Sequence, residues 1–120
     1  MKKIVFGFLF CVVSLFAYEE LTIDNFESKI KGKNVVIDFY AVWCPPCKIL
    51  AENLDDFNTI KPSNVEIYKV NIDNELVLAK KNGVSKLPTL LYFKDGKLVK
   101  ETVGVLSPKE LLQTTEQVFK

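Results

Sequence analysis

The sequence contains neither histidine nor arginine, and every one of its 16 basic residues is a lysine. The absence of histidine excludes imidazole acid–base catalysis and histidine ligation of metals. The absence of arginine excludes the guanidinium clamps that many proteins use to hold phosphate groups. Thiols, carboxylates and amines are therefore the main catalytic side chains that this chain can offer.

The chain also lacks the charge and the size that several functional classes need. Its 16 basic residues nearly balance 15 acidic ones, so nothing favours nucleic acid as a partner. With 120 residues, 48% of them hydrophobic, the chain can form one globular core but not two ordinary domains. No repeat, low-complexity tract or Pro/Gly-rich linker divides the segment from Leu21 onward. We therefore expect a single domain.

The one long apolar run is too short for a membrane span. It covers residues 4–17, follows Lys2 and Lys3, and ends where a tyrosine and two glutamates begin. A positively charged start, a short apolar stretch and a small final residue are the layout of a secretory signal peptide. A membrane-spanning helix needs roughly 20 apolar residues. The alternative is that this segment is retained as an N-terminal membrane anchor.

We expect residues 1–17 to be a signal peptide that is cleaved after Ala17, which leaves residues 18–120 as the mature domain. Removal of two lysines leaves fourteen lysines against fifteen acidic residues, a net charge of −1. Cys11 lies inside the apolar run and is expected to be removed with it. The mature chain then keeps two cysteines.

Hydrophobic periodicity predicts alternating helices and strands. Runs rich in β-branched and aromatic residues predict strands, and apolar residues at helical spacing predict helices. The expected strands lie at 34–40, 65–72, 89–93 and 97–103, and the expected helices at 24–31, 44–61, 75–82 and 107–119. A further short strand is expected near Leu21. This order predicts an α/β fold with a central mixed β-sheet of four to five strands, flanked by helices on both faces.

Turn and cap residues support this assignment at three places. Asp24 is a candidate N-cap for the first helix. The dipeptide at 95–96, Asp-Gly, lies between two expected strands and predicts an antiparallel hairpin. Ser107, followed by Pro108 and then by Glu110, predicts a capping box at the start of the last helix.

The two remaining cysteines lie in the segment WCPPCK, residues 43–48. If a helix begins here, Cys44 takes the N-cap and Cys47 the third helical position, and the two prolines fill positions whose N–H groups have no helical partner. Side chains at these two positions face one another, so the sulfurs can form a disulfide. The helix N-terminus stabilises a negative charge on the outer sulfur. We therefore expect Cys44, at the exposed helix end, to be the nucleophile.

Two structural roles compete with redox chemistry for this pair. A disulfide could act as a staple, the commonest role of cysteines in exported proteins. A disulfide that closes so small a loop, however, removes little entropy from the unfolded chain. Zinc usually takes four Cys or His ligands, where the mature chain offers two. The pattern therefore favours a redox-active disulfide, with no metal and no cofactor.

The segment WCPPCK after VVIDFYAV resembles the active-site segment of the thioredoxin family. The resemblance covers the chain from about Leu21 to Lys120. It includes Asp38, six residues before Cys44, and three further segments: KVNID at 69–73, LPTLLYFKDGK at 87–97 and VGVLS at 103–107. The resemblance implies the thioredoxin fold.

The resemblance also implies catalytic roles. Cys44 is expected to attack substrate disulfides and Cys47 to resolve the mixed disulfide. Asp38 matches a buried carboxylate that exchanges a proton with the inner sulfur, and its apolar strand should raise its pKa. Lys69 matches a lysine that pairs with this carboxylate. A structural role for Asp38, and a partly exposed strand lysine at position 69, are the alternatives.

Five residues are expected to bind substrate beside the dithiol: Trp43, Pro45, Leu87, Pro88 and Gly104. Pro88 matches a cis-proline that faces the cysteines and leaves the preceding backbone free to pair with an extended substrate. The alternatives are a proline that merely starts a strand, and a Trp43 that belongs to the core.

Four positions depart from the common thioredoxin pattern. Pro45 and Lys86 each stand where a glycine is usual, Tyr40 stands for a tryptophan, and Glu52 for a proline that kinks the helix. These changes alter the helix, the charge around the site and the number of first-turn N–H groups. They leave the partner choice and the redox potential open.

Together these features predict an enzyme, a thioredoxin-like protein-disulfide oxidoreductase that reduces disulfides in exported proteins. We expect it to be exported, to the bacterial periplasm, and to be a monomer. A membrane thiol–disulfide carrier is the electron donor that the resemblance suggests. The alternatives are a dithiol oxidase or isomerase on the same fold and a non-catalytic module that binds peptides.

Overall fold

The computed structural model describes residues 18–120. The expected signal peptide at residues 1–17, and Cys11 within it, lie outside the described residues. The described chain forms four helices and four strands in the order α1 (Phe26–Ile30), β1 (Asn34–Tyr40), α2 (Pro45–Asn58), β2 (Val65–Asn71), α3 (Leu76–Lys81), β3 (Thr89–Lys94), β4 (Lys97–Val103) and α4 (Pro108–Val118). No helix in this part of the chain is both long enough and apolar enough to span a membrane.

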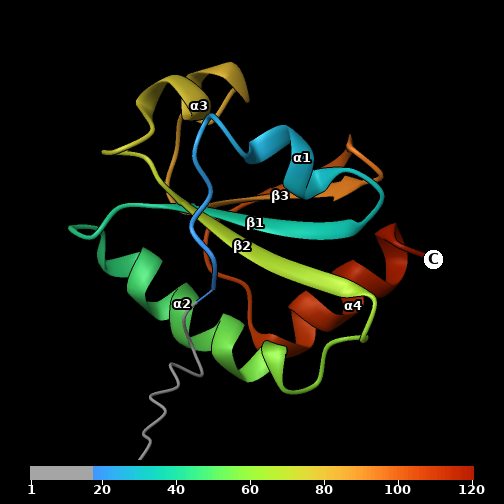
Figure 1. Cartoon of the computed structure of the whole chain (residues 1–120). Coiled ribbons are helices and arrows are strands. Elements are labelled where there is room, and N and C mark those ends of the chain that lie inside the picture. Colours follow the sequence, from blue (N-terminus) through green and yellow to red (C-terminus); the bar gives the residue numbers. More distant parts are fainter. Residues whose placement is uncertain (1–17) are drawn as a thin grey trace, which may run out of the picture.

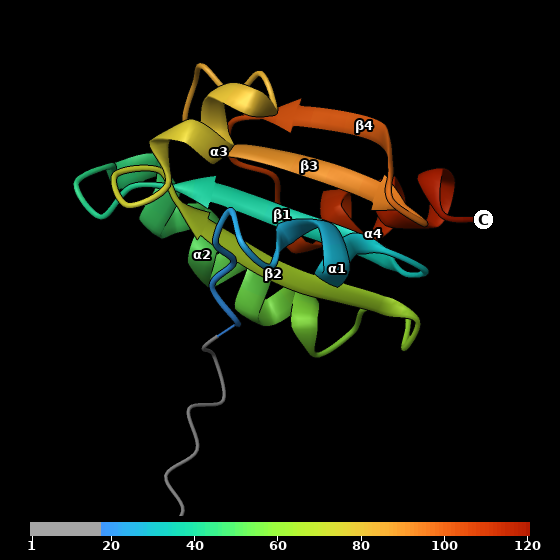
Figure 2. The same ribbon diagram turned by 45° about the horizontal axis from the view of Figure 1, so that its top comes forward.

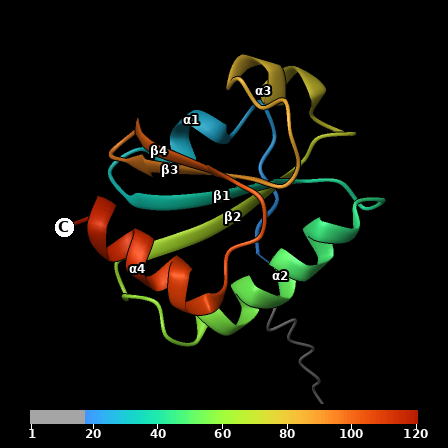
Figure 3. The same cartoon turned by 180° about the vertical axis from the view of Figure 1, so that it is seen from behind.

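The four strands form one mixed sheet in the order β2-β1-β3-β4. Strand β1 is parallel to β2 and antiparallel to β3, and β3 and β4 form an antiparallel hairpin. Figures 1 and 3 show α1 and α3 on one face of this sheet and α2 and α4 on the other. The chain therefore has the thioredoxin fold, as the sequence predicts.

Strand β1 is buried on both faces because helices cover both sides of the sheet. Its side chains alternate between two core clusters: Val35, Ile37 and Phe39 pack with α1 and α3, and Val36 packs with α2 and α4. Alternation places Asp38 on the same face as Val36, under α2. An ionisable group in this layer is costly unless it has a function or a partner.

The hairpin and the last helix have the predicted turn and cap. Asp95 and Gly96, between β3 and β4, both have positive φ, +49° and +82°, as a type I′ turn requires (Figure 2). At the start of α4, Ser107 accepts the N–H of Glu110, and the Glu110 carboxylate accepts the N–H of Ser107. The sequence therefore places both features correctly.

The start of the domain differs from the prediction in two respects. Asp24 is not the N-cap of α1: Asn25 takes that position, and its side chain accepts the N–H of Thr22 without capping the helix. The short first strand is reduced to a single bridge between Glu20 and Lys69, at the β2 edge. The chain turns into α1 directly afterwards, since the Thr22 carbonyl already accepts the N–H of Phe26.

Candidate active site

The dithiol lies at the N-terminus of α2, where the sequence predicts it. Cys44 is the N-cap, and its sulfur accepts the N–H of Cys47 at 3.3 Å. The two residues form a disulfide with a Cα–Cα distance of 5.2 Å. Pro45 and Pro46 fill the first two helical positions and are exposed. The two cysteines at this helix start can therefore alternate between disulfide and dithiol, which takes up or releases two electrons.

Cys44 is more buried than the sequence predicts. In this disulfide form its exposed fraction is 5%, against 3% for Cys47, so exposure does not distinguish the two. Both belong to a small cluster with Ala41, against which Leu87 packs. The physical reason is that the N-cap side chain turns back toward the first helical turn, where its sulfur meets the N–H of Cys47. Position along the helix, and not exposure, remains the basis for assigning the nucleophile.

The residues before the dithiol form an exposed apolar rim. Trp43 is 64% exposed and Val42 is 62% exposed, so Trp43 does not belong to the core. The Trp43 Nε1–H donates a hydrogen bond to Asp73 at 2.9 Å. This bond holds the indole in a defined position on the surface, because it links the active-site loop to the segment that precedes α3.

The loop before β3 lies beside the dithiol. The Leu87–Pro88 peptide bond is cis, as the sequence predicts. Leu87 packs against the cysteine cluster, and the N–H of Gly104 donates to the Pro88 carbonyl at 2.9 Å. The preceding residue, Lys86, is exposed. The fold thus brings the expected substrate-binding residues, which come from three segments, close to the disulfide.

Asp38 lies under α2 in an unfavourable environment for a charge. It is 5% exposed, and its Oδ1 has no hydrogen-bond partner within the described chain. Burial raises the pKa of this carboxyl to about 7, and the positive charge of Lys69 opposes the rise. A carboxyl that titrates near neutral pH can both accept and return a proton.

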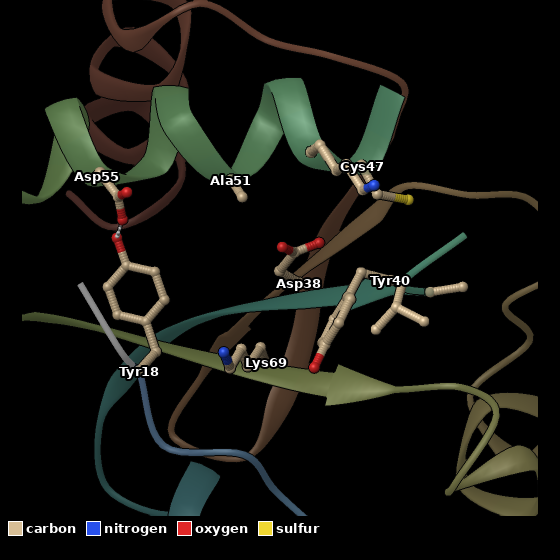
Figure 4. Close-up of a pocket in the computed structure, with 10 residues that line it drawn as sticks. Tyr18, Asp38, Tyr40, Cys47, Ala51, Asp55 and Lys69 are labelled. Atoms are coloured by element: carbon tan, nitrogen blue, oxygen red, sulfur yellow. Dashed lines mark hydrogen bonds between the residues drawn. The ribbon is translucent and has the colours of Figure 1, made fainter. Parts of the chain in front are cut away.

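Asp38 faces a cavity of about 250 Å³ that reaches the inner cysteine. In Figure 4 its carboxylate points toward α2, with Cys47 at one end of the cavity and a pair of side chains from Tyr18 and Asp55 at the other. Lys69 lies opposite Asp38 in the register of β1 and β2. The expected catalytic residues therefore share one site.

Sequence reasoning missed the residues that close this cavity. The Tyr18 hydroxyl donates to Asp55 at 3.0 Å, and the Tyr40 hydroxyl donates to Glu20. Burial is the first cause that raises the pKa of both tyrosines, and these carboxylate partners add to it. Tyr18 and Glu20 come directly after the apolar N-terminal run, so their sequence context indicated only a junction. No local signal could have placed them at the site.

Within residues 18–120, no group of three or more potential metal-binding side chains lies close enough together to hold a metal ion.

Comparison with known proteins connects this geometry to a family. The sequence model described as Thioredoxin matches residues 17–117. Thioredoxin of Chlamydia caviae is 44% identical over 94 residues, which cover 78% of this chain and 91% of that protein. Thioredoxin-1 of Saccharomyces cerevisiae is 45% identical over 84 residues, 69% of this chain and 81% of that protein.

Solved structures agree with the sequence comparison. The oxidised form of mitochondrial thioredoxin 3 from Saccharomyces cerevisiae superimposes with a TM-score of 0.78 at 32% identity, and the match covers 87% of this chain and 99% of that structure. A thioredoxin mutant from Halobacterium salinarum gives a TM-score of 0.77 at 26% identity, over 92% and 97% of the two chains. The match extends over the sheet and the helices on both of its faces.

Proposed function

The chain belongs to the thioredoxin family and is a thiol–disulfide oxidoreductase of that type, and from this premise we propose that it reduces disulfides in exported proteins. The proposal has two parts, a direction of electron flow and a place. The observation that carries the direction is the first turn of α2, where the Cys44 sulfur meets the N–H of Cys47 while positions 45 and 46 are prolines without N–H groups.

The catalytic cycle begins with the reduced dithiol. The Cys44 thiolate attacks one sulfur of a substrate disulfide, forms a mixed disulfide and releases the other substrate sulfur as a thiolate. Asp38 then accepts the proton of the Cys47 thiol through the cavity that both residues line. The Cys47 thiolate attacks the Cys44 sulfur, which closes the internal disulfide and releases the second substrate sulfur as a thiolate that can take up the proton held by Asp38. Two electrons have passed from the protein to the substrate.

Substrate binding is assigned to five residues around the disulfide: Trp43 and Pro45 are exposed, Leu87 and Gly104 are half-buried, and Pro88 is buried. Trp43 and Pro45 flank Cys44 at the start of α2, Leu87 packs against the cysteine cluster, and the carbonyl of the next residue, Pro88, accepts the N–H of Gly104. The backbone around the cis peptide bond is suited to pair with an extended segment of substrate. Lys86 adds a positive charge at this edge, where many thioredoxins have glycine.

The proposed direction follows from the stability of the Cys44 thiolate. A glycine at position 45 would provide an additional N–H, whereas proline provides none. A thiolate with fewer donors is less stable, which disfavours the dithiol form and makes the protein a stronger reductant. An oxidase or isomerase on the same fold is the rival proposal, and the redox potential separates the two.

The proposed place follows from the N-terminal segment. The match to the family begins at residue 17, where the expected signal peptide ends. We propose export to the bacterial periplasm, action as a monomer, and reduction by a membrane thiol–disulfide carrier. Retention of residues 1–17 as a membrane anchor is the alternative.

Expression of the full chain in bacterial cells tests this part. Export with cleavage predicts a periplasmic protein whose mass corresponds to a start at Tyr18. An intact chain in the membrane fraction would support the anchor, and an intact chain in the cytoplasm would contradict export. Replacement of Lys2 and Lys3 by glutamate should block export without changing the purified domain.

A further inference from the structure

The segment Tyr18–Leu21 is attached to the backbone of Lys69. The N–H of Lys69 donates to the Glu19 carbonyl at 3.1 Å, and the N–H of Leu21 donates to the Lys69 carbonyl at 2.8 Å. Leu21 is buried in the core and fixes the end of this segment. Glu20, between these two anchors, therefore has a defined position beside the lysine that faces Asp38.

Glu20 contacts two of the side chains that line the cavity beside Asp38. Its carboxylate lies 3.8 Å from the Lys69 ammonium and accepts a hydrogen bond from the Tyr40 hydroxyl. The same ammonium lies over the Tyr40 ring, 5.7 Å from its centre. Glu20 of the N-terminal segment, Tyr40 of β1 and Lys69 of β2 thus form one cluster around the Lys69 charge.

Within residues 18–120, the Lys69 ammonium forms no ion pair with the Asp38 carboxylate. The ion pair of Lys69 within the described chain is with Glu20, and the Asp38 Oδ1 has no hydrogen-bond partner there. The other titratable groups around Asp38 belong to the same cavity: Tyr18, Tyr40, Cys47, Lys48 and Asp55. Lys69 is the cation that lowers the pKa of Asp38, so its distance from the carboxyl matters most.

We propose that Glu20 is a positioning residue of the active site: it holds the Lys69 ammonium at the solvent side of the cavity, so that Asp38 stays free to accept a proton from Cys47. A lysine in direct contact with Asp38 would hold the carboxylate in its charged form and make it a weaker base. The segment 18–21 thereby acquires a role in the reaction. This role does not depend on where the protein acts or on the net direction of electron flow.

The first experiment compares Glu20→Gln with Glu19→Gln. Glu19 is the matched control because it is the adjacent residue, carries the same charge and pairs with Lys29 at 3.0 Å instead of with Lys69. The measurement is the pH titration of the Asp38 carboxyl carbon by NMR in the reduced protein. We expect Glu20→Gln to lower the midpoint by about 0.5 to 1 pH unit. Glu19→Gln should leave the midpoint within about 0.2 unit of the wild type.

The kinetic consequence is measured on a mixed disulfide between Cys44 and a peptide thiol. Release of the peptide should accelerate with pH as Asp38 ionises, and Glu20→Gln should move this rise to lower pH by the same amount as the NMR midpoint. Glu20→Asp keeps the charge and should restore at least half of the shift. A purely structural loss of the segment would change stability without moving either midpoint.

A double-mutant cycle shows whether Glu20 acts through Lys69. In a Lys69→Gln background, Glu20→Gln should move the Asp38 midpoint by less than half of its effect in the wild type. Equal effects in both backgrounds would mean that Glu20 acts only as a nearby charge, which would overturn the positioning role. The proposal would also be overturned if Glu20→Gln titrated as the wild type does, or if Glu19→Gln produced the same shift.

Discussion

Asp38 shows how one ionisable residue within a hydrophobic strand can define a site. The side chains next to it on β1, from Val35 to Ile37 and at Phe39, are buried and hydrophobic, and its own side chain follows their alternation into the space under α2. The sequence predicts its burial and its raised pKa, because a carboxyl within an apolar strand is expected to be buried and burial disfavours its charged form. What the sequence could not predict is which groups surround it, since these come from positions far away in the chain.

Burial of Asp38 should make stability depend on pH. Its pKa is about 7 in the folded protein and 3.8 in the unfolded chain, so between these values the folded state holds a proton that the unfolded state has lost. Stability therefore falls as pH rises. We expect the unfolding free energy of the oxidised protein to drop by roughly 2 to 3 kcal/mol between about pH 5 and about pH 8.

Denaturant titrations of the wild type and of Asp38→Asn measure this effect. The variant should be nearly flat over the same range, because it cannot ionise and the chain has no histidine that would titrate there. An equally steep profile in the variant would assign the pH dependence to another group.

The serine variants of the two cysteines should trap different amounts of mixed disulfide with partner proteins. Cys44 begins the helix and Cys47 lies in its first turn, so we expect Cys44 to attack and Cys47 to resolve. Cys47→Ser should accumulate mixed disulfides with partner proteins, at least about tenfold more than Cys44→Ser, as seen on non-reducing gels. The double variant is the background control. Equal trapping by the two single variants would contradict the assigned roles.

Among the elements, β1 and α2 were the most predictable. The run at 34–40 is nearly continuous in apolar residues, and its observed bounds equal the predicted ones. Helix α2 begins after Cys44 as expected, because an N-cap followed by two prolines leaves few other conformations. The end of α2 was predicted less well: the sequence pattern predicts an end near Lys61, whereas the helix ends at Asn58. The pattern contains no strong stop signal there.

The N-terminal elements were less predictable because tertiary contacts determine them. Asp24 and Asn25 are both good N-cap residues, and the choice between them depends on the turn at Thr22. The segment 18–21 pairs with β2 only around Lys69. A bridge of one residue has no periodicity to detect.

The first turn of α2 provides a prediction on redox potential. Pro45→Gly adds an N–H beside the Cys44 sulfur and should stabilise its thiolate. We expect the midpoint potential to become less negative by about 30 mV, which corresponds to a tenfold change in the thiol–disulfide equilibrium. Pro62→Gly, in a loop far from α2 in sequence, is the control for the loss of a proline. A more negative potential in Pro45→Gly would show that donor count does not set the potential.

For the whole molecule, fold and chemistry were predictable to different depths. The mixed sheet and its coverage by helices on both faces follow from element order and hydrophobic pattern, and the structure confirms both. The cavity beside the dithiol does not follow, because its walls combine the N-terminal segment, β1, β2 and α2. The contact between Tyr18 and Asp55, for example, joins residues 37 positions apart.

The direction of electron flow is a property of the whole molecule, because the helix N-terminus, the buried carboxyl and the surrounding lysines all contribute to it. The prolines at 45 and 46 remove thiolate donors, and Asp38 opposes a second negative charge in the site when it is ionised. Lys69 and Lys86 act in the opposite sense. Lys86 is exposed and Lys69 is partly exposed, so solvent and salt screen both charges. We therefore expect the loss of backbone donors to dominate.

Titration of the Cys44–Cys47 pair against glutathione buffers of known potential tests the proposed direction of electron flow most directly. The purified domain is equilibrated at each potential and quenched, and the fraction of dithiol is measured by mass after alkylation. A reductant predicts a midpoint near about −270 mV, far from the −120 mV or so of strong protein oxidants. A midpoint less negative than about −180 mV would contradict the reductant and favour the oxidase or isomerase.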